Sequence, residues 1–217
     1  MSRQRETDAD AVLCPVRCHV GARTVESSPP ADLDSSGAEA MRRQDEIHGL
    51  NSTCTKIIRR SCVDLDAVEW PDDICICEDY CLTMQLLPRC RRVVAVAGAY
   101  YQYRINTNSM TRSSDLSRLV SHHVRVYDIL TRNVPGDEAI PARRNLVREI
   151  LYWGVVGGRL ERGEYLRWRS VYDGLGGIWD WSEKSRCGQC LMWLSEWSFW
   201  LGRCLSPLMR SKVDDYL

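Results

Sequence analysis

The sequence predicts an α/β fold in the first half of the chain and a helical region in the second half. Short apolar runs bounded by turn residues, such as RVVAVAG at residues 92–98, are typical of buried strands. From about residue 115, apolar side chains recur instead at the three- and four-residue spacing of amphipathic helices. With 217 residues, the chain is long enough for one mixed domain with a helical appendage. We therefore expect one part over residues 1–112 and a second over 113–217.

The first elements are expected to be a bent strand, a loop and a short helix. Residues 10–20, DAVLCPVRCHV, predict a strand that bends at Pro15. Residues 26–38, ESSPPADLDSSGA, predict a loop because Pro, Ser and Gly dominate the stretch. Ser36 then offers an N-cap for a helix over about 38–48.

The middle of the chain is expected to run from strand to helix to strand. Residues 55–63, TKIIRRSCV, fit a helix or a strand equally well. ICIC at 74–77 predicts a short strand whose two cysteines point into the core. A helix follows from Glu78 to Pro88, since acids at a helix start oppose the positive end of its dipole. The 92–98 run is the next buried strand.

A further extended run follows at residues 99–112, AYYQYRINTNSMTR. It places Tyr101 and Tyr103 on one side and Gln102 and Arg104 on the other. A packed strand face is the simplest interpretation of the two tyrosines.

The second half predicts four helices, over residues 115–133, 142–156, 162–175 and 188–205. In the first helix, His123 lies on the apolar stripe and is expected to pack in the core. His122 is expected to be exposed, and neither histidine is interpreted as a metal ligand. The last helix carries Trp193, Trp197 and Trp200. Such a helix either lies on a membrane surface or packs in a core or subunit contact.

Composition excludes several classes of protein. Lys and Arg total 29 and so do Asp and Glu, so net charge gives no reason to expect nucleic-acid binding. The N-terminus is too charged for a signal peptide, and no apolar run reaches the roughly 18 residues of a membrane span. Eleven cysteines in such a chain predict free thiols. The Cys14–Cys18 and Cys187–Cys190 pairs differ in spacing and lie far apart in the sequence, which argues against zinc.

Three stretches of the sequence resemble the C-terminal part of the glycosyltransferase family 2 catalytic domain, which has the GT-A fold. They are STCTKIIRR at 52–60, CEDYCLTMQLLPRCRRVVAV at 77–96 and AYYQYRINTNSMTRS at 99–113. They occur in the family's order and at suitable spacing, and an amphipathic helix follows them as in the family. The resemblance covers residues 51–112. It implies a partial GT-A sheet with flanking helices, α+β-like in truncated form, before the helical C-terminal region.

The resemblance also implies catalytic roles for the two adjacent acids. Asp79 would be the general base that takes the proton of the acceptor hydroxyl as it attacks the anomeric carbon. A sugar hydroxyl is a poor nucleophile until its proton has an acceptor, so the reaction needs a carboxylate there. Glu78 would orient Asp79 or the acceptor. The alternative is that both acids only stabilise the start of a helix.

Further substrate contacts follow from the same resemblance. Arg104 would hold a phosphate or a polar sugar group through its planar fork of donors, beside Tyr103. Asn108 and Ser109 would shape the turn that carries Arg104, although an ordinary turn is the alternative for the asparagine. Lys56 matches the family's lysine and would meet a phosphate, with an ordinary surface lysine as the alternative.

The chain departs from the family at its start. A complete enzyme begins with a βαβ half that binds the nucleotide and carries a D-x-D motif, which holds the diphosphate through Mn²⁺ or Mg²⁺. The resemblance begins after that half, so we expect a truncated or C-terminal portion. Asp8 and Asp10 have D-x-D spacing, but DADAV fits better as the strand that follows the motif. We therefore expect the cation in the complete enzyme and assign no metal ligand in this chain.

The expected function is inverting transfer of a sugar from a nucleotide-sugar donor to a glycan or lipid-linked acceptor. We expect a cytoplasmic protein with no nucleic-acid partner, with the inner face of the membrane as a second location reached through the Trp-rich helix. An oligomer is compatible with the sequence. The alternative function is a non-catalytic remnant, an interaction module that associates with a partner or a membrane surface.

Overall fold

The computed structural model describes residues 2–20, 23–104, 116–182, 184 and 186–213, and it confirms a mixed α/β composition. The chain forms two compact units. Unit 1 contains residues 1–109 and 128–142, and unit 2 contains 110–127 and 143–217. The domain boundary expected between residues 112 and 113 stays a prediction.

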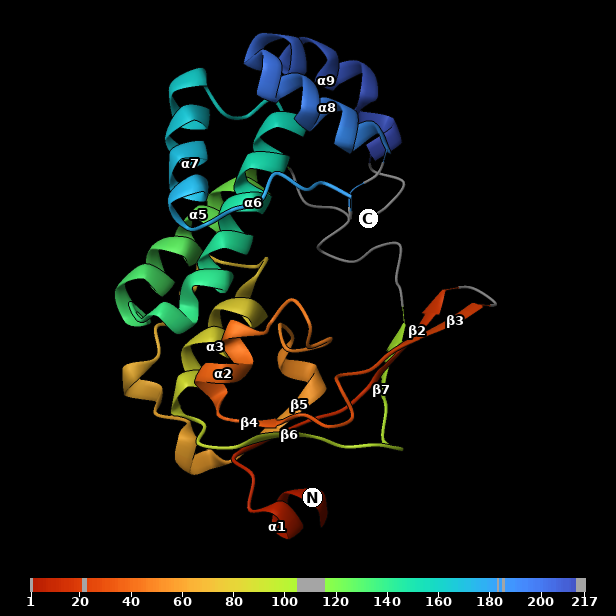
Figure 1. Cartoon of the computed structure of the whole chain (residues 1–217), viewed down its shortest axis with the longest axis vertical. Coiled ribbons are helices and arrows are strands. Elements are labelled where there is room, and N and C mark those ends of the chain that lie inside the picture. Colours follow the sequence, from red (N-terminus) through yellow and green to blue (C-terminus); the bar gives the residue numbers. More distant parts are fainter. Residues whose placement is uncertain (1, 21–22, 105–115, 183, 185, 214–217) are drawn as a thin grey trace. The chain divides into compact units, whose positions relative to one another are not determined.

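The central sheet of unit 1 has the strand order β4-β6-β1-β5 (Figure 1). The strands are β4 (Asp34–Ser35), β6 (Val93–Ala95), β1 (Ala11–Leu13) and β5 (Lys56–Ile58). β1 is parallel to β6 and antiparallel to β5, so Val12 lies between Val94 and Ile57. The β6 strand expected from RVVAVAG is confirmed and its three residues are buried. Residues 55–63, which fitted either helix or strand, begin as β5.

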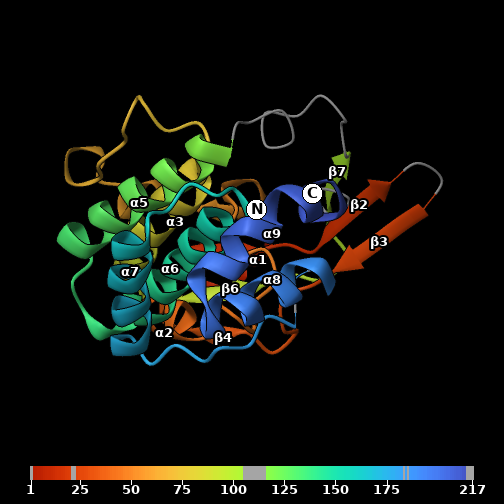
Figure 2. The same ribbon diagram turned by 90° about the horizontal axis from the view of Figure 1, so that it is seen from above.

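A second sheet of unit 1 has the order β3-β2-β7, with strands β3 (Arg23–Ser27), β2 (Val16–Val20) and β7 (Tyr101–Arg104). Figure 2 shows β2 and β3 as a projecting hairpin. The strand expected at 10–20 is only partly right, because the chain is extended there but Pro15 divides it into β1 and β2, which belong to different sheets. The expected loop at 26–38 is only partly right, since it overlaps the end of β3 and contains β4. Both missed strands pair with partners that the local composition does not reveal.

Two helices of unit 1, α2 (Gly37–Arg42) and α3 (Glu78–Leu86), lie on one side of the central sheet (Figure 1). The N-cap expected at Ser36 is confirmed, because its hydroxyl accepts a hydrogen bond from the Glu39 amide at 3.2 Å. α2 ends at Arg42, earlier than expected. Its first residue approaches the end of α3 so closely that a Cβ on Gly37 would lie 1.7 Å from the Leu87 carbonyl oxygen.

The strand expected at residues 74–77 is wrong. Ile74 and Ile76 are buried, whereas Cys75 and Cys77 are only half-buried. Cys77 has a left-handed backbone with φ 67°, which turns the chain directly into α3. The alternating apolar pattern is therefore real, but the isoleucines rather than the cysteines fill the core, and the segment is irregular.

Unit 1 also contains the short helix α1 (Ser2–Thr7) and several single turns of 3₁₀ helix. These turns cover Thr53–Thr55, Arg60–Cys62, Leu65–Ala67, Leu87–Arg89 and Asp137–Ala139. α3 ends at Leu86, two residues before the predicted Pro88, which lies in the 3₁₀ turn Leu87–Arg89 that follows.

Unit 2 is helical. Its helices are α5 (Leu116–Asn133), α6 (Ile140–Val156), α7 (Arg162–Gly174), α8 (Arg186–Trp197) and α9 (Phe199–Val213), of which α5 ends and α6 begins in unit 1. His123 is buried, as expected, with Nδ1 2.6 Å from the Leu119 carbonyl oxygen. His122 is half-buried rather than exposed. None of the helices within the described residues is long and apolar enough to cross a bilayer.

The single helix expected at 188–205 is wrong, because the chain breaks at Ser198 into α8 and α9. The two helices lie side by side in both views (Figures 1 and 2). Their close approach depends on Gly202, where a Cβ would lie 1.9 Å from the Ser195 hydroxyl oxygen. The three tryptophans of this hairpin do not form a core within unit 2. The exposed fractions are 54 % for Trp193, 78 % for Trp197 and 57 % for Trp200.

Candidate functional site

The Asp79 carboxylate is held by a loop from another part of unit 1. Asp79 lies in the first turn of α3 and is half-buried. Ser52 donates a hydrogen bond from its hydroxyl to Oδ2 at 3.0 Å, and the Thr53 hydroxyl donates one to Oδ1. Both carboxylate oxygens therefore have a fixed partner, which limits rotation of the side chain.

This contact pattern differs from helix capping. The N-cap position of α3 is Cys77, and it makes no side-chain capping hydrogen bond. Asp79 is the second residue of the helix, and its carboxylate accepts hydrogen bonds from the hydroxyls of residues 52 and 53 rather than from amides of its own helix. Glu78 is half-buried in the same first turn, where both charges oppose the helix dipole. The dipole accounts for an acid at this position but not for the two hydroxyls aimed at it.

Lys56 lies beneath the same loop. Its Nζ is 3.4 Å from the Gly49 carbonyl oxygen and from Thr55 Oγ1, and it also donates to the Ser52 carbonyl oxygen. Burial lowers the pKa of Lys56 to about 8, although the negative charge of Asp79 opposes this shift. Lys56 is therefore not an ordinary surface lysine, because its ammonium group fastens the loop that positions Asp79.

The start of β7 reaches the same region. The Cys54 Sγ lies 4.0 Å from Asp79 Oδ2, and a hydrogen bond with Cys54 raises the pKa of Tyr101. Tyr103, two residues along the strand, is 45 % exposed, so the expectation that both tyrosines form a packed face is wrong for Tyr103. Arg104 is exposed and pairs in register with His19.

The remaining predicted substrate contacts cannot be placed. Asn108 and Ser109 lie outside the described residues. The structure thus brings Lys56 and Asp79 together, keeps Glu78 beside them in the chain, and places Tyr101 near Cys54 at the edge of the group.

A cavity of about 510 Å³ adjoins this group. It is lined by Thr53, Lys56, Ile58, Val63, Val68, Trp70, Leu82 and Leu86. Thr53 belongs to both features, because it lines the cavity and its hydroxyl bonds Asp79. Sequence reasoning missed Ser52, Thr53 and the cavity. The hydroxyl-rich STCT ahead of Lys56 was the available signal for the first two.

Asp8 and Asp10 do not form a cation site. Arg59 Nη2 lies 2.6 Å from the Asp8 carboxylate, and Arg59 Nε lies 3.3 Å from Asp10. Burial would raise the pKa of Asp10, but the backbone hydrogen bond and charge of Arg91, with the charge of Arg59, hold it below its usual value. Both acids are therefore already neutralised by arginines, and the described residues contain no group of three or more His, Cys, Asp or Glu side chains that could hold a metal ion.

No protein-family model matches this sequence, and no curated protein matches it either. The resemblance to glycosyltransferase family 2 therefore rests on the residues quoted above, and it enters the functional argument as a proposal.

Proposed function

We propose that this chain is an inverting glycosyltransferase of family 2, or a portion of one, which moves a sugar from a nucleotide-sugar to a hydroxyl of a glycan or lipid-linked acceptor. The observation that carries the proposal is the Asp79 carboxylate, half-buried beside a cavity and fixed by hydroxyls at both oxygens. A general base must be held in position before it can accept a proton efficiently.

The proposed chemistry is one displacement at the anomeric carbon. Asp79 takes the proton as the acceptor oxygen forms its bond to that carbon, and the bond to the nucleotide diphosphate breaks with its electron pair. Ser52 and Thr53 hold the carboxylate in one orientation, and Lys56 holds the loop that carries them. Glu78 lies beside the base in the chain, and Arg104 and Tyr103 are the proposed polar contacts to substrate, with Asn108 and Ser109 in the following segment.

Donor binding in the complete family enzyme is expected to use Mn²⁺ or Mg²⁺. The described residues do not fit that cation, because Asp8 and Asp10 are paired with arginines. No step is therefore assigned to a metal here.

The proposal is tested by Asp79→Asn, which keeps the shape of the side chain and removes the base. The 217-residue chain is assayed for sugar transfer with a panel of nucleotide-sugars, alkyl glycoside and glycan acceptors, and Mn²⁺ or Mg²⁺. Asp79→Asn should lower kcat by roughly 10²–10⁴-fold while nucleotide diphosphate binding stays unchanged. The matched control is Asp73→Asn, an exposed acid nearby, which should transfer at the parent rate. Transfer at the full rate by Asp79→Asn would show that the base assignment is wrong.

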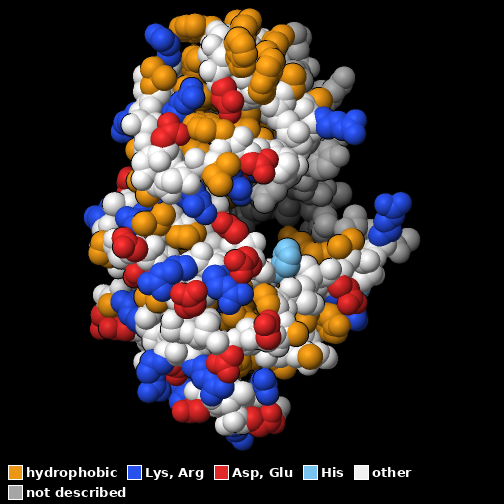
Figure 3. All heavy atoms as spheres, in the orientation of Figure 1, with side chains coloured by type: hydrophobic (Ala, Val, Ile, Leu, Met, Phe, Trp, Pro, Cys, Tyr) orange, Lys and Arg blue, Asp and Glu red, His pale blue; other side chains and the backbone are white. Residues whose placement is uncertain are grey.

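A second candidate function is a non-catalytic interaction module that binds a partner or a membrane surface. The observation that favours it is the exposed Trp193, Trp197, Trp200 and Leu201 on α8 and α9. Figure 3 shows apolar side chains gathered over α8 and α9, at the top of the view. Absence of transfer by the parent chain across the whole panel, together with flotation on anionic vesicles that Trp197→Ser abolishes, would favour this candidate. It would also place the protein at a membrane face.

A further inference from the structure

We propose that the cavity beside Asp79 binds the apolar group of the acceptor, so that the acceptor is a hydroxyl-bearing molecule joined to an alkyl or aryl group. This inference rests on the proposed function for the identity of the ligand as an acceptor.

Helix α3 connects the carboxylate with the cavity. Asp79, Leu82 and Leu86 are spaced by three and four residues, so they lie on one face of the helix. Leu82 and Leu86 line the cavity, and Asp79 stands one turn before them. A ligand seated against the two leucines therefore has the carboxylate near one end of its site.

The cavity has an apolar body and one polar end. Apart from Thr53 and Lys56, its lining side chains are aliphatic or aromatic. Its volume of about 510 Å³ falls in the range of small-molecule sites, which are roughly 300–1,000 Å³ and mostly apolar with a few polar groups. Thr53 and Lys56 are also the residues that contact or face Asp79. An amphipathic ligand with its hydroxyl at that end matches this distribution.

The charge of the lining argues against a free anion. Lys56 is the one charged side chain among the lining residues, and its ammonium group already donates to the loop oxygens of Gly49 and Ser52. An ammonium group has three donors, and Thr55 Oγ1 is also within 3.4 Å of it. An anionic ligand would have to break these contacts, whereas an apolar group leaves them intact.

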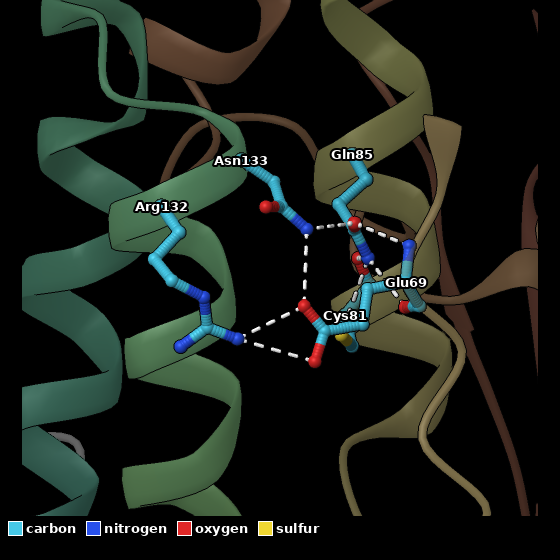
Figure 4. Close-up of polar contacts among 5 residues, drawn as sticks. All are labelled: Glu69, Cys81, Gln85, Arg132 and Asn133. Atoms are coloured by element: carbon cyan, nitrogen blue, oxygen red, sulfur yellow. Dashed lines mark hydrogen bonds and ion pairs between the residues drawn. The ribbon is translucent and has the colours of Figure 1, made fainter. Parts of the chain in front are cut away.

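One wall of the cavity is fixed by a buried amide (Figure 4). Gln85 accepts a hydrogen bond from the Glu69 backbone amide at 3.0 Å and donates one to the Glu69 carbonyl oxygen at 3.0 Å. Arg132 Nη2 reaches the two Glu69 carboxylate oxygens at 3.1 and 2.9 Å. The contacts of Gln85 and Arg132 therefore hold Glu69 in place. Val68 and Trp70, which line the cavity, are its neighbours in the chain.

Trp70 remains 54 % exposed beside Glu69, the residue whose backbone Gln85 holds. Large side chains of this kind release the most free energy when a ligand removes them from water. An exposed tryptophan on a rigid wall beside an apolar cavity is typical of a preformed binding surface.

The test compares binding of octyl β-D-glucoside, below its micelle concentration, with binding of methyl β-D-glucoside, by isothermal titration calorimetry and saturation-transfer NMR. The octyl compound should bind at least tenfold more tightly. Trp70→Ala should weaken its binding at least fivefold, and Leu166→Ala should leave it unchanged. Leu166 is the control because it is also an exposed large apolar side chain, 47 % exposed, but it lies in α7. If Trp70→Ala unfolds by circular dichroism, Val63→Trp, which fills the cavity, replaces it and should block binding.

The outcomes separate this inference from the proposed function. If Asp79→Asn still binds octyl glucoside and neither the parent chain nor any variant transfers sugar, the result would support the apolar site and overturn the proposed transferase function. Equal transfer to methyl and octyl glucosides, with equal affinities, would support the function and overturn the apolar site. A concentration-dependent dimer that Trp70→Ala dissociates in light-scattering measurements would assign the surface to a second copy of the chain and also overturn the inference.

Discussion

Gln85 is the side chain whose replacement should disturb the cavity wall most, and Gln85→Leu tests this with a change of similar size. Gln85 is 2 % exposed, and its amide makes two hydrogen bonds to the Glu69 backbone, two to Cys81 (the carbonyl oxygen and Sγ) and one to Asn133. Leucine preserves the volume but leaves the Glu69 amide and carbonyl without these partners.

The expected loss can be estimated from the individual groups. A neutral hydrogen bond contributes about 1 kcal/mol net, and a buried group left without a partner costs about 1–3 kcal/mol. Asn133 is exposed and can turn to water, and the Cys81 carbonyl lies within the same helix. The loss is therefore concentrated in the two Glu69 bonds, and Gln85→Leu should lower the unfolding free energy by about 2–4 kcal/mol.

The assay is urea unfolding followed by circular dichroism, with hydrogen exchange of the Glu69 amide as a local readout. Exchange at Glu69 should become faster in Gln85→Leu. Gln102→Leu is the control, because Gln102 is exposed on β7 and its Oε1 contacts His19 at 2.7 Å. The control should change the unfolding free energy by less than about 1 kcal/mol. A loss below about 0.5 kcal/mol in Gln85→Leu, with unchanged exchange at Glu69, would refute the reasoning.

Two further predictions concern stability. Burial lowers the pKa of Lys56 from 10.5 to about 8, so the unfolded chain binds this proton more tightly than the folded chain. The unfolding free energy should therefore gain up to roughly 3 kcal/mol from Lys56 as pH rises from 8 to 10.5, and Lys56→Met should remove that contribution from the pH profile of urea unfolding. Gly37→Ala should destabilise the protein by about 1–3 kcal/mol in thermal unfolding, because its Cβ would strike the Leu87 carbonyl. Gly163→Ala should not destabilise the protein, because no atom lies within 4 Å of the added Cβ. Equal losses of stability in the two variants would contradict the packing argument.

Elements that depend on local chemistry were predictable from the sequence. Ser36 caps α2, acids begin α3, and the apolar run at 92–98 contains the buried strand β6. Each of these signals lies within a few residues of the structure that it specifies. Elements that depend on distant partners were not predictable. β4 has two residues and exists because Asp34 and Ser35 pair with Val94 and Val93.

Periodicity also failed where two conformations share one pattern. ICIC alternates as a strand does, but Cys77 adopts a left-handed backbone and the segment enters α3 without pairing as a strand. The apolar run at 188–205 has helical spacing throughout, yet it divides at Ser198, and Gly202 then packs against Ser195 of the neighbouring helix. Two helices packed side by side each bury one face, as a single long amphipathic helix does. The spacing of apolar residues therefore cannot distinguish the two arrangements.

In the candidate site, too, some features follow from the local sequence and others depend on residues far away in the chain. The sequence indicated Asp79 as a base only through the resemblance to glycosyltransferase family 2, because its position at the start of a helix is by itself explained by the helix dipole. The hydroxyls of Ser52 and Thr53 are a separate observation, because they come from a loop 26 and 27 residues away and are aimed at the carboxylate oxygens. A half-buried position strengthens the interaction of the charge with the helix dipole but partly removes the charge from water, and the two hydroxyls replace part of that lost hydration. The loop, its Lys56 anchor and the apolar cavity beneath Leu82 and Leu86 are together the features that a binding site would need and a helix end would not.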